Sequence, residues 1–423
     1  MTIPVRLLLS LLACVFSVAG IAQPLPMASP ASVGMSLERL ERIGNVLNAD
    51  IERNQIPGAV VAIARKGSLV YYEAFGFLDK PQGIPMPRDA IFYIASMTKP
   101  VTTVGALTLV EEARLLVDDP VDNYLPQLSN LSVIRGGSSA TDVTDTESAR
   151  RQPTLQDLMR HTAGFTYGNR DGDPLAELYP QGSRAAADTL TGPEFVETLA
   201  SLPLHYQPGT TWQYGFGLDV LGLVIEAVTD QSLGQFLDAR LFRPLGMVDT
   251  AFVISPEKLD RYAKVLPKDP LTGNDQRIPD FSQPRKFDAG GCCLVSTASD
   301  YLRFAQMLLN GGMLEGTRIL GPKTVEFMTA DQLGPEVNID RLRALLGRNG
   351  YGFGLGVAVR RSTGVSGFIG SAGDYDWGGA NGTYFWVDPR EELAVVLMAA
   401  TPGAMRLHYR QVIRSLVLQA IID

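Results

Sequence analysis

The chain has 423 residues, 45% of them hydrophobic and 19% charged, and its formal net charge at pH 7 is −8. This is the composition of an ordinary globular protein, neither disordered nor fibrous, and the length favours two domains or one elaborate domain. The acidic balance and the lack of a long Lys/Arg run argue against a nucleic-acid partner, which would require a basic patch.

The first 22 residues have the pattern of a signal peptide. Arg6 supplies a short positive start, and the apolar run Leu7–Ala19 is too short to span a bilayer comfortably. Small residues then precede Gln23, as they do at a signal-peptidase site. We therefore expect an exported protein, periplasmic or secreted, with no stable membrane span. Leu11–Cys14 loosely resembles a lipoprotein cleavage box, so lipid anchoring is the minor alternative.

Both ends of the chain carry β-rich segments. The apolar spacing predicts a helix over Leu37–Asn54, followed by two β-rich runs in Gly58–Gly76 that meet at the hairpin signal Lys66-Gly67. Three C-terminal segments are predicted as successive strands: 353–361, 382–389 and 393–400, with a turn at Pro389-Arg390. A closing helix is predicted over His408–Ile422.

The middle of the chain is predicted to contain helices and long polar loops instead of strands. Pro100–Ala113 and Gly217–Val228 have the apolar spacing of helices. Between these helices, Ser129–Pro153 and the segment 169–192 are rich in polar residues and glycine. Loops of this length inside a globular enzyme are commonly functional surfaces, so we expect lids over a pocket.

These elements predict an α/β (α+β) fold with an antiparallel sheet that is built from both chain ends and flanked by helices. Residues 23–95 and 220–423 would form the sheet domain. Residues 96–219 would form an inserted, mainly helical domain with lid-like loops.

Three cysteines argue against a scaffold framed by disulfides. Cys14 lies in the signal segment, and the adjacent Cys292 and Cys293 cannot link distant segments. These two can form a vicinal disulfide in an oxidising compartment, but the Gly-rich run around them favours two small buried residues. No His/Cys cluster has metal-ligand spacing, and we predict neither a metal nor another cofactor.

Ser96 and Lys99, in FYIASMTKP, are the first catalytic candidates. If a helix begins near Ser96, the lysine lies on the same face about 4.5 Å along the axis, because each residue rises roughly 1.5 Å. The amine can therefore reach the hydroxyl. The positive end of the helix dipole favours an oxyanion at the serine, and a desolvated lysine can accept a proton or hold that oxyanion.

The same S-x-x-K spacing recurs at Ser255–Lys258, so chance is a real alternative. There, Ser255 has the pattern of an N-cap, with Pro256 at the first helical position in a charged run, which predicts a solvated helix start. Apolar residues surround Ser96 instead and predict a buried helix. A lysine in a buried helix must be paired or hydrated through a cleft, so the motif alone leaves both readings open.

Two further segments support a site. Tyr214 lies in a Gly-containing turn before an apolar helix, from which a phenol can point into a cleft. Gly378 and Gly379 follow Trp377 where a strand is predicted to begin, and they allow backbone N–H groups to approach a ligand closely.

Together, Ser96-Met97-Thr98-Lys99, Tyr214 and Trp377-Gly378-Gly379 resemble the three motifs of the family VIII carboxylesterases, which are similar to class C β-lactamases and DD-peptidases. The resemblance runs in the expected order from about Ser29 to the C-terminus. It is supported by LLVDDPVDNYLP (Leu115–Pro126), LMRHTAGF (Leu158–Phe165), PGTTWQYG (208–215), PLGM (Pro244–Met247) and LVSTASDYLRF (294–304). It implies a β-lactamase/transpeptidase-like fold.

The resemblance also implies a mechanism. Ser96 would be the nucleophile that forms an acyl-enzyme, Lys99 would keep it activated, and Tyr214 would exchange protons with the serine, the leaving alcohol and the deacylating water. The oxyanion hole would be the backbone N–H groups of Ser96 and Ala380. The residues implied to contact the substrate are Trp377, Gly378, Gly379 and Phe216.

Two departures from the lactamase pattern bear on the substrate. Phe216 stands where the lactamase-like tyrosine motif usually carries an asparagine, and Trp377-Gly378-Gly379 replaces a Lys-Thr-Gly motif. Both changes remove polar contacts to the amide and carboxylate of a β-lactam. We therefore expect an uncharged small-molecule ester, and at most weak hydrolysis of β-lactams such as cephalosporins. The resemblance to the family implies a short acyl chain.

Other functions remain open. A β-lactamase, a DD-peptidase or an acyltransferase would use the same Ser-Lys-Tyr site. A Ser-His-Asp hydrolase would need a nucleophile elbow, but G-x-S-x-G does not occur in this sequence. His161 is the best candidate for the histidine of such a triad, and the alternative for it is a role in structuring its loop. His205 and His408 are predicted to be structural or exposed. A non-hydrolytic peptidoglycan-binding protein is disfavoured because the serine, lysine and tyrosine are all present.

Overall fold

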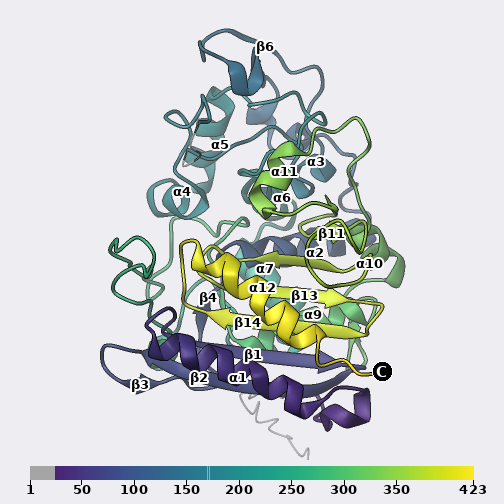
Figure 1. Ribbon diagram of the computed structural model, residues 1–423. Helices are drawn as coiled ribbons and strands as arrows, with labels where there is room; N and C mark the ends of the chain where they lie inside the picture. Colours follow the sequence, from purple (N-terminus) through teal and green to yellow (C-terminus); the bar gives the residue numbers. More distant parts are fainter. Residues whose placement is uncertain (1–23, 169, 171) are drawn as a thin grey trace, which may run out of the picture.

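The computed structural model describes residues 24–168, 170 and 172–423 (Figure 1). Its centre is an antiparallel sheet of eight strands in the order β10-β11-β12-β13-β14-β1-β2-β3. These strands are β1 (Gly58–Arg65), β2 (Ser68–Asp79), β3 (Ile84–Pro85), β10 (Tyr351–Phe353), β11 (Ala358–Arg360), β12 (Tyr375–Gly378), β13 (Tyr384–Asp388) and β14 (Leu393–Ala399). The two chain ends meet where β1 pairs with β14, so the predicted fold class is confirmed.

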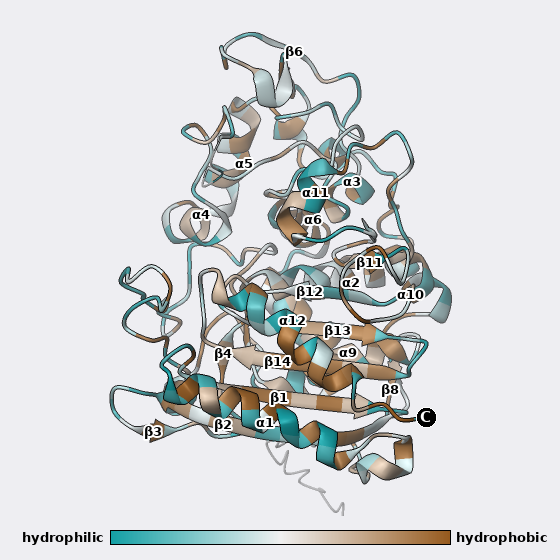
Figure 2. Cartoon of the chain, in the orientation of Figure 1, coloured by the Kyte–Doolittle hydropathy of each residue, from teal (hydrophilic) through white to brown (hydrophobic). Residues whose placement is uncertain are grey.

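The central strands are apolar along their whole length because helices cover both faces of the sheet. In β1, Val60 and Ala62 point into one core, whereas Val61 and Ile63 point into the other. α9 (Ala298–Leu309) packs on the first side, and α1 (Leu37–Glu52) packs with α12 (Met405–Leu418) on the second (Figure 1). Figure 2 shows the polar and apolar residues that alternate along α1 and α12.

The predicted N-terminal helix and hairpin are confirmed. Helix α1 begins after Ser36, whose hydroxyl accepts a hydrogen bond from Arg39 N–H as an N-cap. At the β1–β2 turn, φ is 50° at Lys66 and 77° at Gly67. Positive φ at both central residues of a two-residue loop defines a type I′ turn, whose twist matches that of the paired strands.

Two C-terminal predictions are wrong in detail. The segment 353–361 is not one strand, because β10 ends at Phe353, a turn follows with φ of 76° at Gly356, and β11 returns from Ala358. The Trp-Gly-Gly segment lies at the end of β12 rather than at the beginning of a strand. The closing helix is confirmed as α12, although it begins earlier than predicted, at Met405.

The remaining helices are α2 (Thr98–Glu111), α3 (Leu155–Met159), α4 (Ser183–Thr189), α5 (Gly192–Ser201), α6 (Gly217–Thr229), α7 (Leu233–Leu237), α8 (Arg243–Leu245), α10 (Pro322–Thr329) and α11 (Asp340–Leu346). Helix α6 contacts α2, α3 and α7. The approximate domain boundary predicted between residues 219 and 220 falls three residues into α6, a helix that packs with the helical layer.

Short strand pairs complete the fold: β4 (Phe92–Tyr93) with β7 (Val295–Ser296), β5 (Ser132–Ile134) with β6 (Thr146–Ser148), and β8 (Met313–Leu314) with β9 (Thr317–Arg318). The β4–β7 pair brings the Cys292-Cys293 segment beside Ser96. Residues 1–22, the predicted signal peptide, lie outside the described residues. Among the residues that are described, no helix is long and apolar enough to cross a membrane.

Candidate active site

Ser96 lies in a 3₁₀ turn, Ala95–Met97, between β4 and the first residue of α2. Ala95 has φ of 46°, a left-handed conformation that is uncommon for residues other than glycine and is found at functional turns. The Ser96 hydroxyl accepts a hydrogen bond of 2.8 Å from Tyr214 Oη, and Lys99 Nζ lies 3.4 Å from the same oxygen. The three predicted catalytic side chains are therefore brought together.

Lys99 is buried, with 1% of its surface exposed, and its three N–H donors are directed by its neighbours. One donates to the Gly291 carbonyl at 2.6 Å, and the ammonium lies 4.5 Å from the centre of the Tyr214 ring. The amine therefore contacts both Ser96 and the Tyr214 ring, so the lysine is placed to assist proton transfer at either residue.

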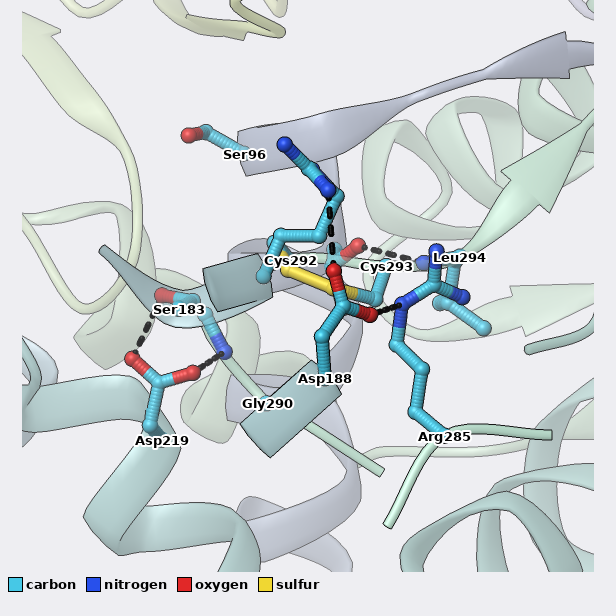
Figure 3. Close-up of a disulfide and its surroundings, with 12 residues drawn as sticks. Ser96, Ser183, Asp188, Asp219, Arg285, Gly290, Cys292, Cys293 and Leu294 are labelled. Carbon is cyan, nitrogen blue, oxygen red and sulfur yellow. Dashed lines mark hydrogen bonds and ion pairs between the residues drawn. A yellow bond between two sulfur atoms is a disulfide. The ribbon is translucent and has the colours of Figure 1, made fainter. Parts of the chain in front are cut away.

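Asp219, at the start of α6, holds the carbonyl that binds Lys99. Its carboxylate accepts hydrogen bonds from Gly291 N–H at 2.9 Å and from Ser183 Oγ at 2.7 Å (Figure 3). A Cβ on Gly291 would lie 2.4 Å from the Asp219 carboxylate, so the contact requires glycine. Burial raises the pKa of Asp219 to about 6, and the nearby Lys99 opposes that rise. Sequence reasoning missed Asp219, although a signal was present. An aspartate inside an apolar helix such as α6 must be paired when it is buried, so it marks a polar contact.

Tyr214 is positioned by an aromatic cluster. Its ring centre lies 4.7 Å from that of His161 and 5.7 Å from that of Trp377, while the Arg170 guanidinium lies 5.0 Å away. His161 is buried, and burial together with Lys99 holds its pKa well below the ordinary value, so the ring is neutral. It makes no hydrogen bond with Ser96 among the described residues, which leaves the loop-structuring role and contradicts the Ser-His-Asp alternative.

The end of β12 forms one wall of the site. Trp377, Gly378 and Ala380 line a cavity of about 590 Å³ together with Ser96. Gly379 does not line it, because that residue lies against the backbone of the nucleophile turn, where a Cβ would come within 2.4 Å of the Ile94 carbonyl oxygen. The predicted substrate contact of Gly379 is therefore replaced by a packing role that brings Ala380 to the cavity.

The substrate contact predicted for Phe216 is also wrong. Its side chain is fully buried and lies in an aromatic cluster, with its ring centre 4.6 Å from that of Tyr167 and 5.1 Å from that of Phe195. Tyr167 lines the cavity, so Phe216 supports the wall from behind.

Cys292 and Cys293 form a vicinal disulfide, which corrects the preference for two unbonded residues, although both are buried as expected (Figure 3). Cys292 lines the cavity. On the other side of the pair, Leu294 N–H donates to Thr98 Oγ1 at 3.2 Å, in the first turn of α2. The disulfide thus closes a short segment that contacts the catalytic helix at both ends, since Gly291 binds Lys99.

The cavity is lined by segments that the sequence did not all indicate. From the predicted loop 169–192 come Arg170 and the start of α4, but 129–153 contributes no lining residue and is folded into the β5–β6 hairpin. The residues that sequence reasoning missed are Leu345, Leu346, Arg348, Phe368, Asp376, Arg406, Leu407, Arg410 and Arg414. These residue types also occur on ordinary surface loops and helix faces. No local sequence pattern therefore distinguishes the cavity-lining residues from other surface residues.

The second S-x-x-K is a helix start, as predicted. Ser255 occupies the N-cap position of a 3₁₀ helix, Pro256–Arg261, but its hydroxyl donates to the Glu257 carboxylate and caps no backbone N–H. Lys258 Nζ donates to the Val248 carbonyl and pairs with Asp249, both at 2.8 Å. Over the described part of the chain, no three His, Cys, Asp or Glu side chains are grouped as a metal site.

Comparison with known proteins agrees with this geometry. The sequence profile of the Beta-lactamase family matches residues 43–417. The chain is 30% identical over 381 residues to Esterase EstB of Burkholderia gladioli, covering 85% of this chain and 90% of that protein. It is 31% identical over 369 residues to Lovastatin esterase of Penicillium rubens, covering 82% and 90%. The solved structure of EstCE1, described as a hydrolase with promiscuous acyltransferase activity, superimposes with a TM-score of 0.74 at 26% identity, covering 92% and 99%.

Proposed function

The chain belongs to the beta-lactamase family and is a serine hydrolase, and we propose that it is a carboxylesterase that hydrolyses short-chain esters through an acyl-enzyme on Ser96. One observation carries this proposal: the Ser96 hydroxyl lies in a cavity within hydrogen-bond distance of both Tyr214 and Lys99. A hydroxyl in contact with a proton acceptor and a cation is the arrangement that nucleophilic catalysis requires.

The first half-reaction starts from the form of the enzyme in which Tyr214 has lost its phenolic proton. Ser96 Oγ attacks the ester carbonyl carbon as its own proton moves to this phenolate oxygen. The tetrahedral oxyanion is held by the backbone N–H groups of Ser96 and Ala380. The bond to the leaving alcohol then breaks, and Tyr214 returns the proton to that oxygen. A water molecule repeats the sequence at the acyl-enzyme and releases the acid. One oxyanion donor is typically worth about 2.7–4 kcal/mol.

The named relatives support an ester substrate, since two of them are called esterases. A second activity is transfer of the acyl group to an alcohol, because the first half-reaction is the same and EstCE1 is described with such activity. A third is slow cephalosporin hydrolysis, which the shared acylating machinery allows. We also propose export after removal of residues 1–22; the Cys292–Cys293 disulfide supports it, because such bonds persist in oxidising compartments.

The test compares 4-nitrophenyl butyrate with a chromogenic cephalosporin in mature wild type, Ser96→Ala and Ser255→Ala. We expect fast ester turnover that only Ser96→Ala abolishes, and slow cephalosporin cleavage. A faster cephalosporin reaction would make the protein a β-lactamase instead. If Ser96→Ala stays active on both substrates, the proposed nucleophile is wrong. Adding a primary alcohol to the wild-type reaction and measuring the new ester gives the share of acyl transfer.

A further inference from the structure

The active-site cavity is rich in arginine although the whole chain is acidic, with a formal net charge of −8. Six arginines line it, against a single acidic side chain, Asp376; they are Arg170, Arg184, Arg348, Arg406, Arg410 and Arg414. An unbalanced group of cations in a partly enclosed space attracts an anionic ligand, because field lines are focused by the low-dielectric walls.

Some of these cations are already neutralised. Asp376 accepts hydrogen bonds from Arg348 at 2.6 Å and from Arg414 at 3.2 Å. Arg414 also pairs with the buried Asp374. At the far wall, Arg184 pairs with Asp188 at 2.9 Å. These arginines therefore have partners that hold their side chains in place.

Three of the cavity arginines have no carboxylate within 4.0 Å among the described residues: Arg170, whose guanidinium lies against the Tyr167 and Tyr214 rings, and the pair Arg406 and Arg410. Arg406 and Arg410 are one turn apart on α12, where like charges repel, and Arg406 is in the first turn, at the positive end of the helix dipole. Burial and the neighbouring Arg406 lower the pKa of Arg410 to about 10, so it remains charged at neutral pH. Nε of Arg410 is buried with no hydrogen-bond partner.

Both arginines line the cavity that holds Ser96, and Arg410 contacts the segment that carries the predicted oxyanion hole. Arg410 Nη2 donates to the Gly379 carbonyl at 2.6 Å, next to Ala380, and its guanidinium lies where a Cβ of Gly378 would be, 2.4 Å from Cζ. Arg406 donates to the Gly403 carbonyl. An anion bound to Arg410 would lie near Ala380, in the cavity that Arg406 also lines. Leucines and a phenylalanine provide an apolar wall in the same cavity: Leu345, Leu346, Phe368 and Leu407.

We propose that Arg406 and Arg410 bind a carboxylate of the substrate, so that the enzyme prefers esters that carry an anionic group on the acyl or the alcohol half. This inference rests on the proposed esterase function. The anionic substrate proposed here differs from the uncharged ester that the loss of a Lys-Thr-Gly motif predicts. The C-terminal helix supplies the positive charge that the missing lysine would have provided. Arginine suits this role because its planar fork can bind a carboxylate through two hydrogen bonds.

Matched substrate pairs test the inference. For the alcohol half, 3-carboxy-4-nitrophenyl butyrate is compared with 4-nitrophenyl butyrate; for the acyl half, mono-4-nitrophenyl adipate is compared with 4-nitrophenyl hexanoate. The readout is the ratio of kcat/KM between the anionic and the neutral member of each pair. The variants are Arg406→Gln and Arg410→Gln. Arg390→Gln is the control, since it removes one exposed arginine at the β13–β14 turn, outside the cavity lining.

We expect wild type to prefer the anionic member of at least one pair, and each cavity variant to lower that ratio about 10- to 100-fold, as for loss of a charge-assisted hydrogen bond. Arg390→Gln should leave the ratio unchanged. A wild-type ratio at or below one that neither variant changes would overturn the inference, while turnover of the neutral esters would keep the esterase function. If Arg410→Gln slows both members because the Gly379 carbonyl shifts, Arg406→Gln decides. Loss of all ester turnover in wild type would refute the esterase proposal itself.

Discussion

Removal of one oxygen atom from Tyr214 gives the sharpest test of the mechanism. Tyr214→Phe deletes the hydroxyl that lies 2.8 Å from Ser96 Oγ and keeps the ring that packs on His161 and Trp377. General acid–base catalysis contributes roughly 10²–10⁴ in rate, so we expect kcat/KM for 4-nitrophenyl butyrate to fall by that factor. At about 1.36 kcal/mol per tenfold, this is about 2.7–5.4 kcal/mol of transition-state stabilisation.

A neighbouring tyrosine supplies the control. Tyr167 also lines the cavity and packs on Tyr214 at 5.6 Å between ring centres, but its hydroxyl lies 2.9 Å from Ser183 Oγ rather than near the nucleophile. Tyr167→Phe removes one buried hydrogen bond, which costs about 0.5–1.5 kcal/mol of stability. We expect it to lower Tm slightly and to change kcat/KM by less than about tenfold.

The assay is initial-rate hydrolysis with matched circular-dichroism melts, followed by a burst experiment for the acyl-enzyme. A Tyr214→Phe enzyme that melts like wild type but has lost activity identifies the hydroxyl as the proton carrier. If its kcat/KM stays within about threefold of wild type, less than half a power of ten, proton transfer does not pass through Tyr214. The lysine would then be the remaining base, through its 3.4 Å contact with Ser96.

Two further predictions concern stability and redox state. Burial raises the pKa of Asp300 from 3.8 to about 7, so the folded state keeps a proton that the unfolded chain releases, and unfolding free energy falls as pH rises from about 4 to 7. That contribution, on the order of 4 kcal/mol, should disappear from urea titrations of Asp300→Asn between those pH values; an unchanged slope would contradict it. Thiol titration of the denatured mature protein should find no free cysteine before dithiothreitol and two after it. Reduction should lower kcat/KM about tenfold, matching the Cys292→Ser/Cys293→Ser variant, because it loosens the segment that positions Lys99.

Local rules predicted much of the fold. Helical spacing gave α1 and α6, a two-residue turn signal gave the β1–β2 hairpin, and apolar runs gave β13 and β14. The sequence also predicted that strands from the two ends of the chain share one antiparallel sheet, whereas the strand order is known from the structure alone. The error at 353–361 arose because the residues on both sides of Gly356 are apolar and suit a strand, while the reversal depends on that glycine at positive φ.

Helix geometry predicted that Lys99 could reach Ser96, while the role of Tyr214 came from the resemblance to the family VIII carboxylesterases. The surrounding pocket was not predictable. Phe216 lies two residues after Tyr214, and Gly379 lies between Gly378 and Ala380, all three of which line the cavity. Phe216 nevertheless points into an aromatic cluster, and Gly379 packs on Ile94. Neighbours in sequence point to different sides of a turn or strand, so nearness to a motif does not establish contact with a ligand.

The charge of the pocket is a property of tertiary structure alone. Arg406 and Arg410 lie on an amphipathic helix, where a sequence reading assigns arginine to the solvated face. They become site residues only because α12 crosses the sheet at the end of β12, where Gly378 leaves room for the guanidinium. The glycines of a catalytic motif can thus serve two partners, the backbone N–H groups that hold an oxyanion and an arginine from a distant helix. If Arg406 and Arg410 bind a substrate carboxylate as we propose, the preferred substrate charge depends on how that helix crosses the motif, and it can change while the nucleophile and its proton carrier stay the same.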